Sequence, residues 1–131
     1  MSKVYDFLKD CGAFFLLTVN ENTPVGRPFG AVMEYENRLY FTTATMKEVY
    51  KQLKANDNVQ IVALKHGTRE WIRISGKAKE CFDFDIKEKM LECCPVLVKR
   101  YDSPKSEFFA LFSVEEIKAV LNTNDGIIEL C

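Results

Sequence analysis

A run of alternating side chains at residues 70–82 limits the possible folds more than any other part of the sequence. Small and aliphatic residues occupy every second position: Ile72, Ile74, Gly76 and Ala78. Larger or polar residues occupy the positions between them: Trp71, Arg73, Ser75 and Lys77. Side chains alternate between the two faces of a strand but not of a helix, so the run predicts a long strand with one face toward a core.

Further apolar runs, bounded by turn-forming residues, predict the rest of a sheet. Residues 13–19 are almost continuously apolar and lead into a turn. Residues 25–35 and 38–43 are joined by Glu36-Asn37, so we expect these two runs to pair as a hairpin. The remaining expected strands are residues 59–64, residues 108–121 with an interruption near Glu115, and residues 127–130.

Three segments have the apolar spacing of amphipathic helices: residues 2–11, 46–55 and 84–94. Ser2 is the expected N-cap of the first helix. Thr45 and Glu48 fit a capping box for the second, in which each side chain bonds the backbone N–H of the other residue. Asp83 or Asp85 is the expected cap of the third helix, which Pro95 ends, and residues 96–105 are expected to form a loop.

Isolated helices between mostly hairpin-linked strands predict a mainly β fold with flanking helices, in which an antiparallel sheet closes into a small barrel. We expect a single domain over residues 1–131, because soluble domains commonly have about 100–150 residues. A doubly wound fold would alternate strands and helices regularly. Gly26 and Gly30 also lack the GxGxxG spacing of a dinucleotide-binding loop.

The charge balance excludes several classes of partner. The chain has 18 basic and 19 acidic side chains, a net charge of −1, which argues against nucleic-acid wrapping and against attachment to anionic membranes. No apolar run approaches the ~20 residues of a membrane span, and residues 1–12 do not have the shape of a signal peptide. We therefore expect a cytoplasmic protein.

Cysteine and histidine usage argues against a metal site and against hydrolase chemistry. The five cysteines include the adjacent pair Cys93-Cys94 but no CxxC spacing, so we interpret them mainly as small apolar residues, with a redox role for the pair as the alternative. His66 is the only histidine and lies in the turn-like His66-Gly67-Thr68. A Ser-His-Asp triad needs its imidazole beside a nucleophile, and this turn offers none.

The segment from residue 38 to residue 53 is the best candidate for binding an anion. A strand ending in Thr42-Thr43 leads into a helix, and a helix N-terminus offers free amides and partial positive charge. The positive charge of Lys47 is unfavourable beside the partial positive charge of that helix end, unless an anion lies between them. Arg27 would add a second cation from the paired strand. The alternative is that Lys47 and Arg27 are solvated surface charges.

Trp71 and Arg73 share the outward face of the long predicted strand. A second copy of the chain or a flat aromatic ligand would cover this face, since exposed Trp and Arg are typical of such contacts. The alternative is a surface tryptophan that packs on its own barrel.

Several short motifs occur in a specific order and spacing. They are residues 27–32 (RPFGAV), residues 39–43 (LYFTT), Lys47, Gln52-Leu53, Asn56 and residues 71–78 (WIRISGKA). In this order they resemble the pyridoxamine 5′-phosphate oxidase-like family of FMN-binding split barrels. The resemblance covers roughly residues 10–82 well and the remainder loosely.

The resemblance implies an antiparallel split β-barrel that forms a homodimer, with two FMN sites at the subunit interface. The residues that it assigns to the cofactor are Arg27, Pro28, Phe29, Gly30, Ala31, Val32, Thr42, Thr43, Lys47 and Trp71. The backbone of residues 27–32 would follow the flavin ring. The guanidinium of Arg27 and the ammonium of Lys47 would hold the phosphate, and Trp71 would contact flavin, often from the partner subunit.

Departures from the family pattern restrict the expected activity. Met46 stands where full-length members have a basic residue, and the connection from Thr43 to Lys47 is shorter. Trp71 is the only tryptophan, so the C-terminal segment that closes over flavin and substrate in the vitamin B6 oxidases has no counterpart. The resemblance therefore points away from pyridoxamine phosphate oxidation and toward the short relatives, such as nitroimidazole-resistance-like reductases and flavin-binding stress proteins.

The leading functional hypothesis is an FMN-dependent oxidoreductase acting on a small, flat substrate that the sequence does not identify. Flavin carries the redox chemistry itself, so no catalytic residue is assigned. One alternative is a non-catalytic flavin carrier or redox sensor. Another is that the same barrel binds haem or a deazaflavin. For haem the sequence offers only one histidine as an axial ligand, His66, and a cysteine is the other possible ligand.

Overall fold

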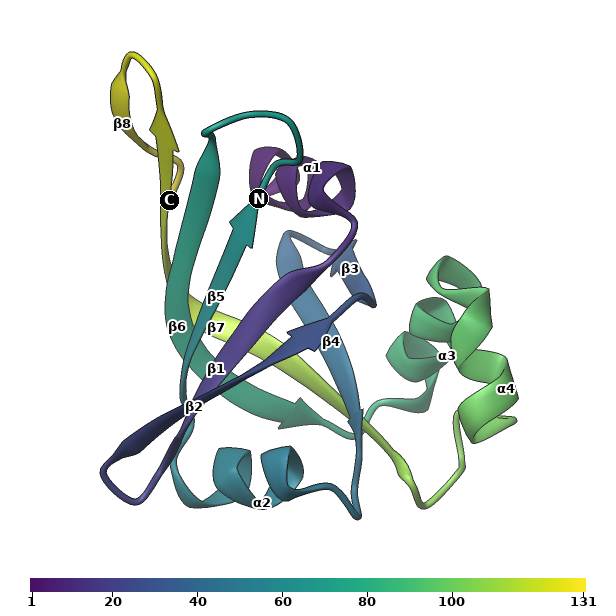
Figure 1. Cartoon of the computed structure of the whole chain (residues 1–131). Coiled ribbons are helices and arrows are strands. Elements are labelled where there is room, and N and C mark those ends of the chain that lie inside the picture. The colour runs from purple at the N-terminus through teal and green to yellow at the C-terminus, as the bar shows by residue number, and fades with distance from the viewer.

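The computed structural model describes all 131 residues. The elements in chain order are α1 (Ser2–Cys11), β1 (Phe14–Asn20), β2 (Thr23–Phe29), β3 (Val32–Tyr35), β4 (Arg38–Ala44), α2 (Glu48–Ala55), β5 (Asn58–Leu64), β6 (Trp71–Cys81), α3 (Phe84–Cys93), the 3-10 turn η1 (Pro95–Leu97), α4 (Val98–Tyr101), β7 (Phe109–Thr123) and β8 (Gly126–Glu129). Figure 1 shows α1 and α2 at opposite ends of the barrel, and α3 and α4 beside it.

All strand pairs are antiparallel, in the order β2-β1-β5-β6-β7-β4-β3, with β8 added to β7. The two edge strands, β2 and β3, follow each other in the chain but do not pair. Gly30 and Ala31 carry the chain from one edge to the other, so the sheet curls into a barrel that stays split at this point. The structure confirms the predicted antiparallel split barrel.

The barrel interior holds the main hydrophobic core, to which every strand from β1 to β7 except β2 contributes fully buried residues. Helices α1 and α2 close its two ends with Val4, Leu8, Val49 and Leu53. Burying such side chains stabilises the fold by about 1.5–3 kcal/mol each. The barrel therefore needs no disulfide, and all five cysteines are free thiols.

Strand β6 has the predicted alternation. Ile72 and Ile74 are fully buried in the barrel, whereas Trp71 is half-buried and Arg73 is exposed. A register shift against β7 lies opposite Gly76, where a Cβ atom would approach the carbonyl oxygen of Glu115 to 2.7 Å. Gly76 thus allows the backbones of β6 and β7 to pack closely. The interruption predicted near Glu115 is an irregularity in the pairing, and β7 continues through it.

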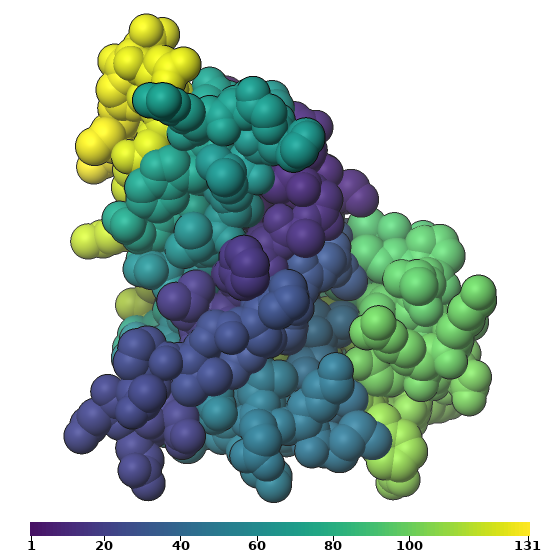
Figure 2. Space-filling view, viewed as in Figure 1, coloured from purple at the N-terminus to yellow at the C-terminus, as the bar shows by residue number.

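A second core lies outside the barrel, where α3, η1 and α4 pack on the outer faces of β3, β4 and β7. Its members include Met33, Tyr40, Met90, Leu97 and Tyr101. Strand β4 and the first part of β7, residues 109–114, are therefore buried on both faces. In Figure 2 the green surface of α3 and α4 borders the blue surface of β2 to β4. This arrangement gives the barrel's split a second wall.

Two of the predicted helix caps are wrong. Met1 is the N-cap of α1, and the Ser2 hydroxyl instead donates to the carboxylate of Glu34. Helix α2 begins at Glu48 with Lys47 as its N-cap, and no capping box forms. Thr45 is engaged elsewhere, because its hydroxyl donates to the carbonyl of Glu107. The predicted cap by Asp83 is confirmed, since its carboxylate accepts from two backbone amides of α3.

Two predicted segments also need correction. The run at residues 25–35 is not one strand: it breaks at Gly30 and Ala31, and only β3 pairs with β4, whereas β2 pairs with β1. Residues 96–105 are not all loop, because Pro95 starts a 3-10 turn that continues into α4. None of the helices combines the length and apolar character that a membrane-spanning helix needs.

Candidate cofactor-binding cleft at the split of the barrel

A cleft of about 220 Å³ lies where the chain crosses from β2 to β3. Three segments form its walls: the crossing itself, the end of β4 with the following turn, and the η1–α4 segment. The lining residues are Pro28, Phe29, Gly30, Ala31, Thr42, Thr43, Lys47, Leu97, Arg100 and Tyr101. The cleft thus gathers residues that are up to about seventy positions apart in the sequence.

The first wall contains backbone N–H and C=O groups that form no hydrogen bond with another part of the chain. Gly30 and Ala31 lie outside the strands and take part in none of the backbone hydrogen bonds of turns and loops. A folded chain seldom leaves such groups without a partner unless they face water or a ligand. This wall can therefore bind a flat polar ligand through main-chain contacts.

The second wall is the end of strand β4. Pairing with β3 stops at Phe41, so the β3-side edge of β4 is open at Thr42 and Thr43. Both threonines are buried, and the Oγ1 atom of Thr43 has no hydrogen-bond partner. A buried hydroxyl without a partner costs about 1–3 kcal/mol, a cost that a hydrogen bond from a bound ligand would remove. Thr43 is the only residue of the chain with such an atom.

Lys47 brings positive charge to the same cleft. It is the N-cap of α2, in extended conformation, and its side chain is exposed and forms no ion pair. The first two amides of the helix, those of Glu48 and Val49, have no backbone partner. Free amides at a helix N-terminus beside a cation are suited to an anion such as phosphate.

The third wall, η1–α4, contributes residues that sequence reasoning did not assign to the site. Arg100 is exposed, and its side chain forms neither an ion pair nor a hydrogen bond within the chain. Tyr101 is buried, and its ring stacks on Phe109 with centroids 4.7 Å apart. Burial raises the pKa of Tyr101, so its hydroxyl stays protonated at neutral pH. The motif Lys99-Arg100-Tyr101 was the available signal, but it lay in a predicted loop.

A second hollow of about 170 Å³ adjoins the cleft and shares Lys47, Arg100 and Tyr101 with it. Ala44, Met46 and Phe108 complete its lining. The two cations therefore stand between two adjoining spaces, one lined by threonines and backbone and the other by apolar side chains. A ligand with an anionic group and an apolar part matches this distribution.

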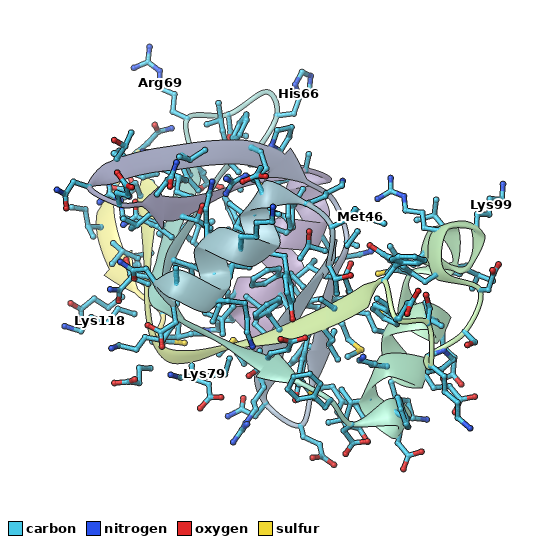
Figure 3. The ribbon with its side chains drawn as sticks, turned by 90° about the horizontal axis from the view of Figure 1, so that it is seen from below. Met46, His66, Arg69, Lys79, Lys99 and Lys118 are labelled. Atoms are coloured by element: carbon cyan, nitrogen blue, oxygen red, sulfur yellow. The ribbon has the colours of Figure 1, made fainter.

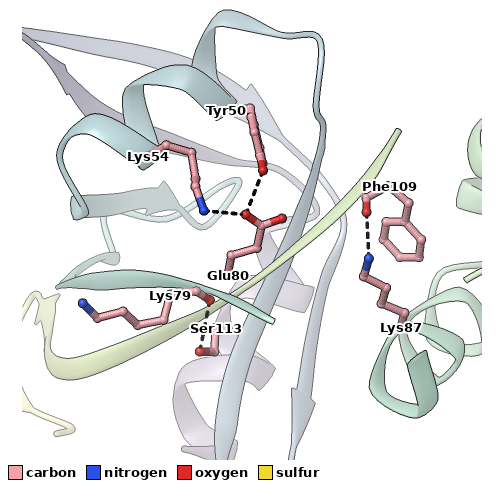
Figure 4. A network of polar contacts seen from close by, with 7 residues as sticks. All are labelled: Tyr50, Lys54, Lys79, Glu80, Lys87, Phe109 and Ser113. Carbon is pink, nitrogen blue, oxygen red and sulfur yellow. Dashed lines mark hydrogen bonds and ion pairs between the residues drawn. The ribbon is translucent and has the colours of Figure 1, made fainter. Parts of the chain in front are cut away.

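A polar network fixes helix α2 against the barrel. The carboxylate of Glu80 on β6 is 6% exposed and accepts hydrogen bonds from the Tyr50 hydroxyl at 2.8 Å and the Lys54 ammonium at 2.9 Å (Figure 4). The hydrogen bond to Glu80 raises the pKa of Lys54, and burial followed by the same carboxylate raises that of Tyr50. Because α2 is held in this way, the position of Lys47 at its start is fixed.

A buried lysine holds the other wall. The ammonium of Lys87 on α3 donates to the carbonyl oxygen of Phe109 at 3.0 Å and lies over the Phe109 ring at 5.4 Å (Figure 4). Phe109 in turn stacks on Tyr101. Lys87 therefore connects α3 to the aromatic residue that supports the cleft.

The position of Arg27 differs from the sequence-based argument. Arg27 lies on β2, which pairs with β1 and not with β4, so the premise that its strand pairs with residues 38–43 is wrong. Its guanidinium donates to the Thr18 hydroxyl at 2.8 Å and to the Gln52 amide oxygen at 2.9 Å. Burial lowers its pKa, and no carboxylate neutralises it. Arg27 joins β1 to α2 behind the cleft and does not line it.

Trp71 also lies outside the cleft. It is at the start of β6 on the outer face of the barrel, where the Arg73 guanidinium stacks 4.8 Å from its ring. Figure 3 shows His66 and Arg69 projecting from the nearby β5–β6 loop, away from Met46 and from Lys99 on α4. The outer face around Trp71 includes the exposed apolar residues Phe15, Leu64 and Ile127, which the strand register places on the same face as Trp71.

A larger hollow of about 460 Å³ occupies the outer face of β1, β5 and β6. Polar residues such as Gln60, Ser75 and Lys77 form most of its lining. None of the residues assigned to the cofactor lines it, and its two unpaired lysines, Lys77 and Lys118, share it with the carboxylate of Glu116. The cleft at the split is therefore the better candidate site.

Comparison with known proteins agrees with this fold. The sequence profile described as Pyridoxamine 5'-phosphate oxidase matches residues 1–120. The chain belongs to the pyridoxamine 5′-phosphate oxidase family. A NimC/NimA family protein from Clostridium acetobutylicum has a similar structure, with a TM-score of 0.92 and 32% identity over 99% of this chain and 93% of that chain. None of the curated proteins compared matches the chain.

Two more distant structures share the fold. A pyridoxamine 5'-phosphate oxidase-related, FMN binding protein from Nostoc punctiforme has a TM-score of 0.69 and 16% identity, over 95% of this chain and 84% of that chain. A heme binding protein from Mycobacterium smegmatis has a TM-score of 0.76 and 10% identity, over 94% of this chain and 54% of that chain.

In this member of the pyridoxamine 5′-phosphate oxidase family, seven of the ten residues predicted to contact the cofactor line the cleft: Pro28, Phe29, Gly30, Ala31, Thr42, Thr43 and Lys47. Val32 follows directly as the first residue of β3, with its side chain buried. Arg27 and Trp71 lie elsewhere, the first behind the cleft and the second on the outer face.

Proposed function

We propose that this chain is an FMN-binding flavoprotein that acts as an oxidoreductase on a small, flat substrate. The observation that carries the proposal is the buried, partnerless hydroxyl of Thr43, a residue that lines the cleft together with free backbone groups and two unpaired cations. These groups match a flat heterocycle joined to a phosphate. Family membership and the FMN binding protein among the structural relatives support the same cofactor.

Lys47 and Arg100 are the proposed phosphate contacts, with the free amides at the start of α2. Each charge-assisted contact to a phosphate contributes on the order of 1.5–3 kcal/mol. The hydroxyl of Thr43, that of Thr42 and the backbone of Gly30 and Ala31 would hold the polar edge of the ring. Bound FMN would supply the redox chemistry, so the chain needs to bind it, orient it and exclude water.

We further propose that the site is completed by a second copy of the chain. Pockets that enclose a ligand of this size commonly measure ~300–1,000 Å³, and the cleft of about 220 Å³ is smaller. The outer face around Trp71 and Arg73 exposes several large apolar side chains, among them Leu64, which is 61% exposed. A homodimer that joins this face to the cleft of its partner would cover both.

The heme binding protein among the relatives raises haem as another ligand for the same fold. The lining residues here disfavour it, because neither hollow contains a histidine or a cysteine and Met46 is the one thioether. His66, the only histidine, lies in the β5–β6 loop. Tyr101 lines the cleft, but its raised pKa keeps the phenol protonated, which makes it a weak axial ligand for haem.

The test begins with the visible spectrum and an FMN titration of the purified protein. We expect flavin bands and saturable binding of one FMN per chain. Stopped-flow mixing of the reduced protein with a nitroaromatic, a quinone or oxygen then separates an oxidoreductase from a carrier or sensor. An oxidoreductase turns over one of these acceptors repeatedly. A protein that binds no FMN, or one that shows a haem spectrum, would refute the proposal.

A further inference from the structure

The adjacent residues Cys93 and Cys94 lie between two of the three walls of the cleft, the β2–β3 crossing and the η1–α4 segment. Both Sγ atoms point at one acceptor, the carbonyl oxygen of Val32, at 3.8 and 3.7 Å. Two sulfurs that share a single oxygen lie close together. Cys93 is exposed and also contacts the Tyr5 hydroxyl at 3.8 Å, whereas Cys94 is half-buried.

Cys94 connects three parts of the fold: α3 and η1 through its backbone, and β3 through its thiol. Its amide donates to the carbonyl of Met90 at the end of α3, and its own carbonyl accepts from the amide of Leu97 in η1. Leu97 lines the cleft, and α4 with Arg100 follows directly. The shared acceptor Val32 follows Ala31 of the opposite wall. Any change at the thiol pair therefore acts on both walls.

We propose that Cys93 and Cys94 form a redox-modifiable dithiol that is oxidised by low-molecular-weight disulfides and controls the neighbouring cleft. The exposed thiolate of Cys93 attacks one sulfur of the small disulfide, and one small thiol leaves. Cys94 then loses its proton and attacks the Cys93 sulfur, so that the Cys93–Cys94 bond forms and the second small thiol leaves. Two protein thiols are oxidised by two electrons, and one disulfide is reduced to two thiols.

The order of attack follows from the surroundings of each thiol. Burial raises the pKa of Cys94 to about 11, and the neighbouring Cys93 sulfur raises it further, so Cys94 stays protonated at neutral pH. Cys93 is the accessible thiol. Adjacent Cα atoms are ~3.8 Å apart, less than the ~4.4–6.8 Å usual for a disulfide, so the oxidised pair is strained and readily reduced. Such a bond suits a reversible switch.

The effect on the cleft rests on the proposed FMN binding. Forming the bond would draw the sulfurs away from Val32 and change the peptide at the start of η1, which displaces Leu97 and Arg100. We expect FMN affinity to fall about 5-fold or more, the lower end of typical coupling between sites, and to recover when a dithiol reductant is added.

The experiment treats the full-length protein with oxidised glutathione and maps thiols by mass spectrometry. Cleavage after Lys89 and Lys99 gives a peptide of residues 90–99 that contains only these two cysteines. In the wild type we expect this peptide to lose two hydrogen atoms. In Cys94→Ser, which lacks the resolving thiol, we expect a stable glutathione adduct on Cys93. Cys131→Ser changes an exposed cysteine elsewhere and is the matched control.

Recovery of the peptide with two free thiols, or with two separate glutathione adducts, would overturn the dithiol site. Oxidation of the peptide without any change in FMN affinity would overturn its control of the cleft. If the reduced protein binds no FMN while the peptide still forms its disulfide, the proposed function fails and the thiol pair stands. The mass readout thus separates the two proposals.

Discussion

Lys47 and Arg100 line the same cleft from different walls, and neither forms an ion pair with an acidic side chain. The chain has one more acidic than basic residue, so acidic partners are not scarce. Six ion pairs form elsewhere in the chain, including Lys51 with Glu48 on the same helix as the Lys47 cap. Two free cations around one hollow therefore indicate an anionic ligand.

Lys47→Ala should weaken FMN binding by roughly 10-fold to 150-fold, because one charge-assisted phosphate contact of about 1.5–3 kcal/mol is lost. Riboflavin, which lacks the phosphate, should bind almost as before. Lys51→Ala, which removes an exposed charge from the next turn of α2, should leave both affinities unchanged. Equal losses for FMN and riboflavin would show that Lys47 does not contact the phosphate.

Thr43→Val should raise the stability of the ligand-free protein and lower its affinity for FMN. The substitution keeps the shape but removes a buried hydroxyl that has no partner, so the free energy of unfolding should rise by about 1 kcal/mol. The same hydroxyl is proposed to bind the cofactor, so affinity should fall severalfold. Denaturant unfolding and an FMN titration measure the two effects. A destabilised variant with full affinity would contradict the assignment.

Trp71→Ala should leave the barrel folded but weaken the dimer, FMN binding or both. Trp71 is half-buried on the outer face, and the barrel interior is filled by its neighbours Ile72 and Ile74. Analytical ultracentrifugation reports the dimer and circular dichroism the fold. In the wild type, FMN should quench the emission of this single tryptophan by energy transfer. Undiminished emission in a fully loaded sample would place Trp71 away from the flavin.

Gly76→Ala should lower the free energy of unfolding by about 1–3 kcal/mol, as overpacking commonly does. The new Cβ atom would lie 2.7 Å from both the Glu115 carbonyl oxygen and the Val114 side chain. Gly26→Ala is the control, because its Cβ would meet only Leu17 at 3.5 Å, an ordinary contact. Urea unfolding of both variants checks the difference. Equal stability of the two would mean that the strands separate easily.

Stability should fall as the pH rises above about 10. Burial raises the pKa of Tyr5 to about 12 and also raises that of Tyr40, Tyr50 and Tyr101. A raised phenol pKa favours the protonated form in the folded state, so the folded state gains stability below the ordinary pKa of ~10 and loses it as these groups ionise. Lys54, whose pKa is raised by Glu80, acts in the same direction. Thermal unfolding between pH 8 and 12 tests this.

The sequence was sufficient where a local pattern decided the structure. The alternation at Ile72 and Ile74 determined which face of β6 enters the core, and Asp83 capped α3 as its position predicted. Local pattern failed where distant segments compete for the same group. Thr45 has the right spacing for a capping box but bonds the carbonyl of Glu107, which is sixty-two residues away.

The candidate site was predictable only in part, for the same reason. The motif residues of the β2–β3 crossing and of β4 could be assigned by resemblance. The place of Arg100 in the cleft depends on how α3 and α4 pack against β4 and β7, which no local spacing encodes. The break at Gly30 was missed because residues 25–35 keep enough alternation to resemble one strand.

The split barrel also bears on solubility. An unpaired sheet edge can recruit a strand from another molecule and start aggregation, and each of the two strands that flank the split has such an edge. One edge strand, β2, contains Pro24 and Pro28, which cannot donate to a new ladder, and the other, β3, has four residues. At the split, the backbone groups of Gly30 and Ala31 are therefore accessible to a small ligand, whereas β2 and β3 offer few backbone hydrogen bonds to a strand from another molecule.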